Sequence, residues 1–407
     1  MEKNGKKNIF ICPLAWGTGH ATRVQVIGEK LKQRGHKIYI AAPRALHRTF
    51  GKSTYDELIT LWSPPVYYPG YLPLYLAVLL QLPLLLWGFL SDRLRLPAMI
   101  RRYNVDIVIS DNRFGMWNKK VYSIYITHQL RVALPRGLGF FEPPVSAIHR
   151  SVIRRYDECW VPDFPGDNNL SGRLSHDCRM HANTRYIGPL SRFVILPRWR
   201  GSDSNRWRES PDSCQLISSS SSPSLAIASS GSSVPDPCLA GADLPPSLRM
   251  TKFTLALLSG PEPQRTNLEN IIISQKDKLP GKLVIVAGTP GNERETGNDI
   301  LRYPWLDGMA LGQLIHRADL IICRPGYSTI MDLFYLRRSA ILIPTPGQPE
   351  QEYLALYMAE KYGINTVKQK EMAKLSTLPA ARNDIPWPEK DPGLPDKVLD
   401  QLFKRLP

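Results

Sequence analysis

A strand that ends in a loop and opens a helix carries the strongest chemical signal of the chain, C-R-P-G-Y-S-T-I-M-D at 323–332. Gly326 relaxes the turn, and Ser328 or Thr329 caps the helix and adds hydroxyl donors to its free backbone N–H groups. Such a helix start binds phosphate well. Asp332 follows one turn later and can accept hydrogen bonds from a ribose diol. The motif therefore predicts a phosphate-and-ribose site.

The loop after the next strand is rich in proline and polar groups, P-T-P-G-Q-P-E-Q-E at 344–352. It is rigid, and it delivers amide and carboxylate groups that can bind sugar hydroxyls. Packing alone explains poorly why two loops of this kind follow adjacent strands. Together they favour a ligand that contains both phosphate and sugar.

A second glycine loop, W-G-T-G-H at 16–20, stands between the first apolar strand and the first helix. Gly17, Thr18 and Gly19 let the backbone approach a ligand closely. His20 begins the helix, where an imidazole facing a cleft could take a proton. The loop is not a full G-x-G-x-x-G motif, and a tight structural turn is the alternative.

Two more strand ends supply polar side chains. His128 ends the strand before Gln129 and competes with His20 for the role of base. Asp111, Asn112 and Arg113 end the preceding strand. Because ligands bind at the carboxyl ends of parallel strands, these three residues are expected to line a ligand-binding cleft. The alternative is a helix cap with a surface arginine.

Strands that alternate with helices could position these residues, and the sequence contains two blocks with this alternating pattern. In the first block we expect strands at 8–13, 37–42, 105–110, 121–127 and 158–161, and a helix at 22–33. In the second we expect strands at 252–259, 282–287, 318–323 and 339–344, and helices at 266–273, 311–317, 329–335 and 353–361. The pattern predicts an α/β protein of two doubly wound, Rossmann-like parallel-sheet domains facing across a cleft.

The domain boundaries follow from composition. Residues 1–197 form the expected acceptor-binding domain and 249–407 the expected donor-binding domain. Between them, 198–248 is predicted to be a disordered linker or insertion, since 202–233 alone contains 14 serines and few aromatic or β-branched residues.

Charge narrows the class of partner. The chain has 407 residues, with 52 basic and 36 acidic side chains, which gives a net charge of +16. Such a charge favours anionic partners: phosphorylated small molecules, anionic lipid or nucleic acid. The sequence lacks a zinc finger, an aromatic RNA-binding motif and any Lys/Arg block longer than three, so a basic nucleic-acid-binding protein is the weaker alternative.

The stretch 71–90 is almost purely apolar and is followed by Arg93, Arg95, Arg101 and Arg102. A single membrane span here would put strands of one sheet on opposite sides of the bilayer. An interfacial surface docked on an anionic leaflet fits better, with a buried helix pair as the alternative. The N-terminus lacks the pattern of a signal peptide. We therefore expect a cytoplasmic protein, peripheral at the inner face of the cell membrane.

The C-terminal motifs, from about residue 252 to 364, resemble the GT-B glycosyltransferases of family 28, including the kind that adds N-acetylglucosamine to a lipid-linked precursor. The resemblance implies a UDP-sugar donor, such as UDP-N-acetylglucosamine. Its diphosphate would bind Gly326, Ser328 and Thr329, and its ribose Asp332. The donor sugar would bind Gln351 and Glu352. The loop with Ser259, Gly260 and Arg265 would also approach the donor.

The same resemblance implies single displacement with inversion at the sugar, with His20 as the base. The chain contains no D-x-D motif, so we expect neither a metal nor another cofactor. A helix N-terminus and a cation would offset the diphosphate charge, and Arg324 and Arg265 are the candidate cations. Glu352 departs from the glutamine usual in the family, which leaves a hexose or an N-acetylhexosamine as the sugar. The alternative enzyme is a UDP-sugar hydrolase or epimerase on the same fold.

Overall fold

The computed structural model describes residues 5–65, 76, 79–135, 137–176, 181–194, 251–289, 295–297, 299–377, 379, 382, 384–391 and 393–406. The predicted linker 198–248 and most of 66–78 lie outside the described residues. All further statements concern the described part of the chain.

The first domain is built on a seven-stranded parallel sheet of order β3-β2-β1-β4-β5-β6-β7. Its strands are β1 Asn8–Pro13, β2 Lys37–Ala42, β3 Glu57–Thr60, β4 Ile107–Asp111, β5 Tyr122–Ile126, β6 Glu158–Val161 and β7 Thr184–Tyr186. The helices are α1 Thr18–Gln33, α3 Leu82–Tyr103 and α4 Glu142–Ile153, with short 3-10 turns η1 Arg44–Thr49, η2 Gly139–Phe141, η3 Gly172–Leu174 and η4 Arg192–Val194. The central strands are apolar and buried on both faces because helices cover the sheet on both sides.

The second domain has a six-stranded sheet of order β10-β11-β9-β8-β12-β13. Its strands are β8 Phe253–Leu257, β9 Lys282–Val286, β10 Glu295–Gly297, β11 Ile300–Tyr303, β12 Leu320–Cys323 and β13 Ile341–Leu342. Only the β10–β11 pair is antiparallel among these described strands. The helices are α6 Gln264–Ser274, α7 Gly308–Arg317, α8 Tyr327–Leu336, α9 Pro349–Tyr362 and α10 Gln369–Met372, with the 3-10 turn η6 Lys276–Lys278.

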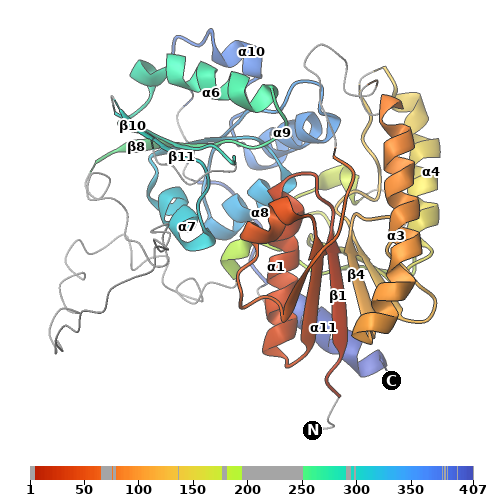
Figure 1. Ribbon diagram of the computed structural model, residues 1–407. Helices are drawn as coiled ribbons and strands as arrows, with labels where there is room; N and C mark the ends of the chain where they lie inside the picture. Colours follow the sequence, from red (N-terminus) through yellow and green to blue (C-terminus); the bar gives the residue numbers. More distant parts are fainter. Residues whose placement is uncertain are drawn as a thin grey trace, which may run out of the picture.

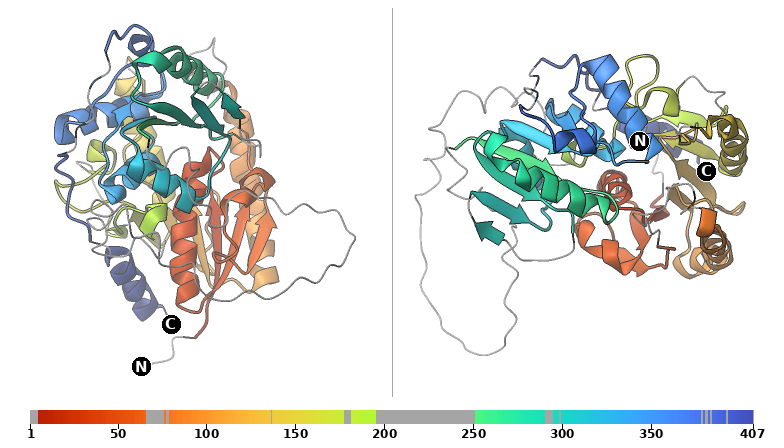
Figure 2. Two further views of the ribbon diagram at one scale, coloured as in Figure 1. Left: turned by 90° about the vertical axis from the view of Figure 1, so that its left-hand side faces the viewer. Right: turned by 90° about the horizontal axis from the view of Figure 1, so that it is seen from above.

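The prediction of two parallel-sheet α/β domains is confirmed. Figures 1 and 2 show the two sheets as separate bodies, with the starts of α1 and α8 meeting between them. The short strands β3, β7, β10 and β11 were not predicted. Several of their residues are only partly buried, so they lack the continuous apolar run that marks the central strands.

The last helix, α11 Leu394–Arg405, returns to the first domain, although the predicted second domain ran to residue 407. Asp396 pairs with Lys30 Nζ at 2.8 Å and with Arg34 Nη2 at 2.7 Å. The rings of His36 and Phe403 stack with centroids 4.1 Å apart. The chain therefore crosses between the domains a second time after the donor-side sheet is complete.

Helix α3 carries its apolar side chains on the outside. The face that packs on the domain consists of Gly88, Ser91, Asp92 and Leu96. Gly88 allows this close approach, since a Cβ there would lie 2.7 Å from the Pro64 ring. Exposed large apolar side chains at this helix and just before it are Leu79, Leu80, Leu82, Leu86, Trp87, Phe89, Leu90 and Leu94. The described part of the stretch is thus a surface ridge rather than a buried helix pair.

The ridge lies at the end of the first sheet that faces the second domain. Helix α3 leads into β4 and runs opposite to it, so its first turns stand at the carboxyl ends of the strands. Phe140 and Phe141 of η2 and Ile148 of α4 are further exposed large apolar side chains of the first domain. Among the helices that the structure describes, none is both long and apolar enough to cross a membrane.

Candidate functional site

A pocket of 430 Å³ lies between the domains, at the carboxyl ends of the strands of both sheets. From the first domain it is lined by the glycine loop, His20, Arg23, His128 and Arg192. From the second it is lined by Ser259, Gly260, Trp305, Gly326, Tyr327, Ser328, Thr329, Asp332, Gln348, Glu350 and Gln351. Most of the residues predicted on both sides of a cleft are therefore brought together.

The start of helix α8 faces this pocket with its backbone donors available. Gly326 is the residue before the helix, and no side chain of the described residues caps it. The first-turn N–H groups and the positive end of the helix dipole therefore suit an anion. Ser328 donates to the carbonyl oxygen of Gly19 at 3.1 Å. A Cβ on Gly19 would lie 2.7 Å from Ser328 Oγ, so the glycine permits contact between the two loops.

Asp332 lies one turn into α8 and also lines the pocket. Ser191 Oγ donates to its Oδ1 at 2.8 Å, and Arg192 Nε lies 3.0 Å from its Oδ2. Burial raises the pKa of Asp332 above its ordinary value, and Arg192 opposes that rise without cancelling it. Arg192 was not predicted, and it supplies a cation beside the anion-binding helix start.

The two arginines predicted to offset phosphate charge do not line the pocket. Arg324 is buried and donates to the carbonyl oxygens of Ile343, Pro344 and Gln264 and to Gln369 Oε1, at 2.6–3.1 Å. Arg265 forms ion pairs with Glu262 and Glu269. Both arginines join elements of the second domain, so their predicted role as cations of the reaction is corrected here. The arginines that line the pocket are Arg23 and Arg192.

At the start of α9 the polar pair that reaches the pocket is Glu350 with Gln351, not Gln351 with Glu352. Glu352 turns back and accepts from the N–H of Gly347 at 3.0 Å. Gln351 Oε1 accepts from the N–H of Thr345 at 2.9 Å, which fixes the loop before the helix. The prediction for this pair was wrong by one residue.

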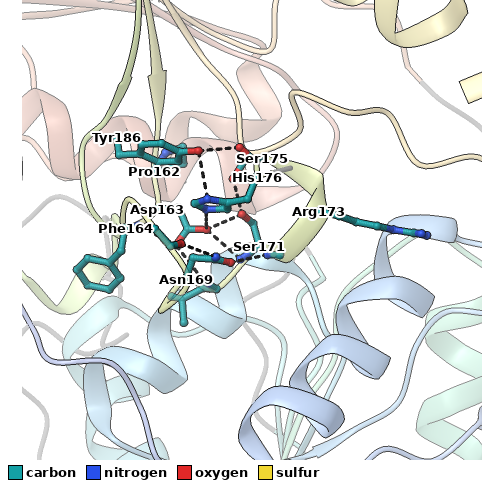
Figure 3. A network of polar contacts seen from close by, with 12 residues as sticks. Pro162, Asp163, Phe164, Asn169, Ser171, Arg173, Ser175, His176 and Tyr186 are labelled. Atoms are coloured by element: carbon teal, nitrogen blue, oxygen red, sulfur yellow. Dashed lines mark hydrogen bonds and ion pairs between the residues drawn. The ribbon is translucent and has the colours of Figure 1, made fainter. Parts of the chain in front are cut away.

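A loop of the first domain holds both pocket-lining helices in place (Figure 3). Asp163 is fully buried, and its carboxylate accepts from the N–H groups of Phe164, Leu170 and Ser171 at 2.8–2.9 Å. The loop then receives tyrosine hydroxyls from the second domain. Tyr327 of α8 donates to Pro162 O at 2.9 Å, and Tyr362 of α9 donates to Asn169 O at 2.6 Å. The donor-side helices are thus anchored on the acceptor-side sheet.

His20 pairs with a buried carboxylate. Its Nδ1 lies 3.0 Å from Asp111 Oδ1, and Asp111 is fully buried. Burial lowers the pKa of His20, Asp111 opposes the change, and Arg23 adds to it, so the ring is kept neutral. For Asp111, burial would raise the pKa, but Arg23 and His20 hold it below its ordinary value. A neutral imidazole oriented by a carboxylate can accept a proton.

His128, the competing base, has both ring nitrogens engaged. Arg23 Nη1 lies 3.0 Å from its Nδ1, and its Nε2 lies 2.8 Å from Glu350 Oε1. Its ring stacks parallel to that of Tyr327, with centroids 4.4 Å apart. For His20, only contacts of Nδ1 are found among the described residues. The geometry therefore favours His20 over His128 as the base.

Asn112 and Arg113 lie below the cleft rather than along it. Asn112 accepts from the Tyr125 hydroxyl at 3.0 Å. Arg113 is buried, and its guanidinium grips Asp92 of α3 through Nε at 3.0 Å and Nη2 at 2.5 Å. None of the three residues predicted to line a cleft, Asp111, Asn112 and Arg113, lines the pocket, so that prediction is corrected for all three. Through this contact, Arg113 holds α3 on the first domain, and the exposed leucines of α3 face outward.

Replacing Arg113 by Met is therefore expected to cost stability. The change leaves the buried Asp92 carboxylate without its partner, which typically destabilises a protein by about 3 kcal/mol. Denaturant unfolding measures the loss. The double variant Arg113→Met/Asp92→Leu removes the orphaned charge and should regain most of it. A single variant as stable as the wild type would contradict this assignment.

The pocket residues that the sequence analysis did not assign include Arg23, Arg192, Trp305 and Glu350. Arg23 had a readable signal, since it lies three residues after His20 and so on the same face of a helix. Trp305 follows β11 and is 41 % exposed in the pocket. Within the described ranges, no cluster of three His, Cys, Asp or Glu side chains is placed to hold a metal ion.

Comparison with known proteins agrees with this architecture. Residues 267–385 match the glycosyltransferase family 28 C-terminal domain. No curated protein matches the chain. The fold resembles that of UGT89C1 from Arabidopsis thaliana complexed with UDP-L-rhamnose, with a TM-score of 0.56, 14% identity and 99% of each chain covered.

Two further solved structures are similar at the level of the fold. The glycotransferase of kitacinnamycin has a TM-score of 0.54 and 14% identity, over 98% of this chain and 90% of that one. The calicheamicin glycosyltransferase CalG4 has a TM-score of 0.54 and 10% identity, over 90% and 86%. With its two facing parallel-sheet domains, the chain has the GT-B fold, and residues 267–385 match the glycosyltransferase family 28 C-terminal domain.

Proposed function

We propose that the protein transfers a hexose or N-acetylhexosamine from a UDP-sugar to a hydroxyl of a lipid-linked or membrane-confined acceptor, with inversion at the sugar and without a metal. One observation carries the proposal. The start of α8, whose first backbone N–H groups have no side-chain cap, lines the same pocket as His20, and His20 pairs with the buried Asp111.

The donor half of the pocket suits a nucleoside diphosphate. The uncapped start of α8 and the nearby Arg192 offer positive potential for the diphosphate. Asp332 can accept from ribose hydroxyls, and the exposed ring of Trp305 offers a flat apolar surface for a base. Glu350 and Gln351 can bind the hydroxyls of the sugar.

The first domain would supply the base. Asp111 orients His20 so that its second ring nitrogen, Nε2, can take the acceptor proton as the hydroxyl attacks the anomeric carbon. The sugar–phosphate bond breaks on the opposite side, and UDP leaves toward α8. A single displacement of this kind inverts the configuration. The positive helix end and Arg192 stabilise the departing diphosphate, and no other cofactor is needed.

The ridge on α3 supports a membrane-confined acceptor. It presents exposed leucine, tryptophan and phenylalanine side chains on the helix face turned away from the domain, and exposed Arg95, Arg101 and Arg102 follow it. Apolar insertion beside cations suits an anionic leaflet. We therefore place the protein at the cytoplasmic, inner face of the cell membrane as a peripheral enzyme.

A ligand titration tests the donor. Thermal unfolding is followed with UDP, UDP-N-acetylglucosamine, UDP-glucose, GDP-mannose and NAD, because a ligand that binds only the folded state raises the unfolding temperature. We expect stabilisation by UDP and by at least one UDP-sugar. Preference for GDP-mannose would overturn the donor, and no response to any nucleotide would remove the proposed donor site.

Replacing Asp332 by Ala is expected to weaken UDP binding about 10-fold to 100-fold, because a hydrogen bond to a charged group contributes about 1.5–3 kcal/mol. Calorimetry with UDP and with 2′,3′-dideoxy-UDP identifies the contact. The wild type should lose affinity when the ribose hydroxyls are removed, whereas the variant should bind both ligands alike. Equal affinity of wild type and variant for UDP would exclude the ribose role of Asp332.

A further inference from the structure

We propose that Arg23 is a positioning residue that ties the base His20 and its partner Asp111 to the donor-side carboxylate Glu350, through His128. The inference rests on the proposed function, since it assigns a partner to the base named there. It makes the proton-accepting group and the sugar-binding group one connected network across the cleft.

Arg23 occupies the centre of this network. It is 2 % exposed and lies one turn after His20 on α1. Its Nε and Nη2 form a fork on Asp111, at 3.1 Å from Oδ2 and 3.0 Å from Oδ1. The same Nη2 contacts His20 Nδ1. Arg23 Nη2 therefore contacts both the Asp111 carboxylate and the His20 ring, and the fork fixes the carboxylate that orients the base.

The remaining terminal nitrogen of Arg23 reaches toward the other domain. Nη1 lies 3.0 Å from His128 Nδ1. Because a guanidinium can only donate, Nδ1 of His128 must accept, and its ring proton sits on Nε2. That Nε2–H then donates to Glu350 Oε1 at 2.8 Å, while Gln129 Nε2 donates to Oε2 at 2.5 Å. Arg23 thus selects the tautomer that holds Glu350 at the pocket.

Four charged or titratable groups face His20 in this network. Asp111 of β4, and Glu350 at the start of α9, favour its charged form, while Arg23 and His128 oppose it. The Arg192–Asp332 pair lines the same pocket as a closed ion pair. Removing Arg23 would leave the negative charges of Asp111 and Glu350 in place, so the ring of His20 would hold its proton at higher pH.

The test measures the protonation of the His20 ring by NMR as a function of pH, on the full-length protein labelled with ¹³C and ¹⁵N at histidine. The His20 signal is assigned with His20→Gln. In the wild type we expect the ring proton of neutral His128 on Nε2. In Arg23→Met the titration midpoint of His20 should rise by about one pH unit or more. Glu350→Gln removes a negative charge and should move the midpoint down.

Matched variants separate charge from position. Arg34→Met removes an arginine of the same helix whose partners are Asp396 and Asp400, and it should leave the His20 midpoint unchanged. Arg23→Lys keeps the charge but not the fork, so the midpoint should stay near the wild-type value while turnover falls about 10-fold or more. If Arg23→Met does not fold, Arg23→Lys and Glu350→Gln carry the test.

The outcomes distinguish this inference from the proposed function. Equal His20 midpoints in wild type, Arg23→Met and Glu350→Gln, or shifts of the same sign in both variants, would overturn the role of Arg23. These results do not depend on the acceptor. Failure of the proposed function instead shows as turnover retained by His20→Ala or as no binding of UDP.

Discussion

Turnover is expected to fall about 100-fold to 10,000-fold when His20 is replaced by Ala, because a positioned general base contributes about that much. The affinity for UDP should not change, since the diphosphate and the ribose are assigned to α8, Arg192 and Asp332. His20 meets the pocket on the acceptor side, with Asp111 behind it. The variant should therefore bind its donor normally and fail at proton transfer.

The measurement compares UDP release with UDP binding. Release is followed from the UDP-sugar that stabilises the protein most, with vesicles of a total membrane lipid extract as the source of acceptors. His47→Ala is the matched control, since His47 is bound to Ala42 O in the first domain and does not line the pocket. Undiminished release by His20→Ala, with loss of release in His128→Ala, would pass the role of base to His128.

The fold could be predicted from the sequence because the central strands are short apolar runs rich in β-branched residues, and several of them are followed by a loop with glycine or proline. β1, β2 and β6 have the predicted bounds. The donor loop was readable for the same reason, since a glycine after a buried strand and before a helix leaves few structural alternatives. A local sequence pattern is sufficient to predict a site when the ligand would bind to the backbone of a single strand–loop–helix unit.

The directions in which individual side chains point could not be predicted from these local patterns. Arg324 directly follows β12, yet its long side chain turns away from the pocket to bind carbonyl oxygens. At the start of α9, successive residues point about 100° apart, so Glu350 and Glu352, which are two positions apart, point to nearly opposite sides of the helix. A sequence motif places a helix start well and individual side chains less well.

The cations of the site depend on contacts between distant segments. Arg192 meets Asp332, which lies 140 positions later in the chain, and Arg23 meets Asp111 and His128 from the other elements of its own sheet. Neither contact leaves a local pattern. The burial of Arg113 on Asp92 is of the same kind. The sequence therefore allowed the glycine loops and His20 to be predicted, but not the arginines that pair with the carboxylates of the site.

The apolar ridge is expected to hold the protein on anionic membranes. Replacing Leu82, Leu86 and Leu90 by Ser should release it from vesicles of phosphatidylcholine and phosphatidylglycerol, because these leucines are 43–58 % exposed on successive turns of α3. Burying a leucine contributes about 1.5–3 kcal/mol, so the loss of three should reduce vesicle binding at least 1,000-fold. Sedimentation with vesicles measures the bound fraction.

The control for this variant replaces exposed apolar residues elsewhere. Leu356→Ser with Ile273→Ser changes side chains of similar exposure in the second domain and should leave vesicle binding unchanged. Because the three leucines of α3 face outward, their replacement should also leave the unfolding temperature and UDP affinity near those of the wild type. A folded triple variant that still binds the vesicles would show that the ridge does not dock on the membrane. Released protein that still cleaves its UDP-sugar with water as acceptor would show that the ridge brings the enzyme to its acceptor and takes no part in the chemistry.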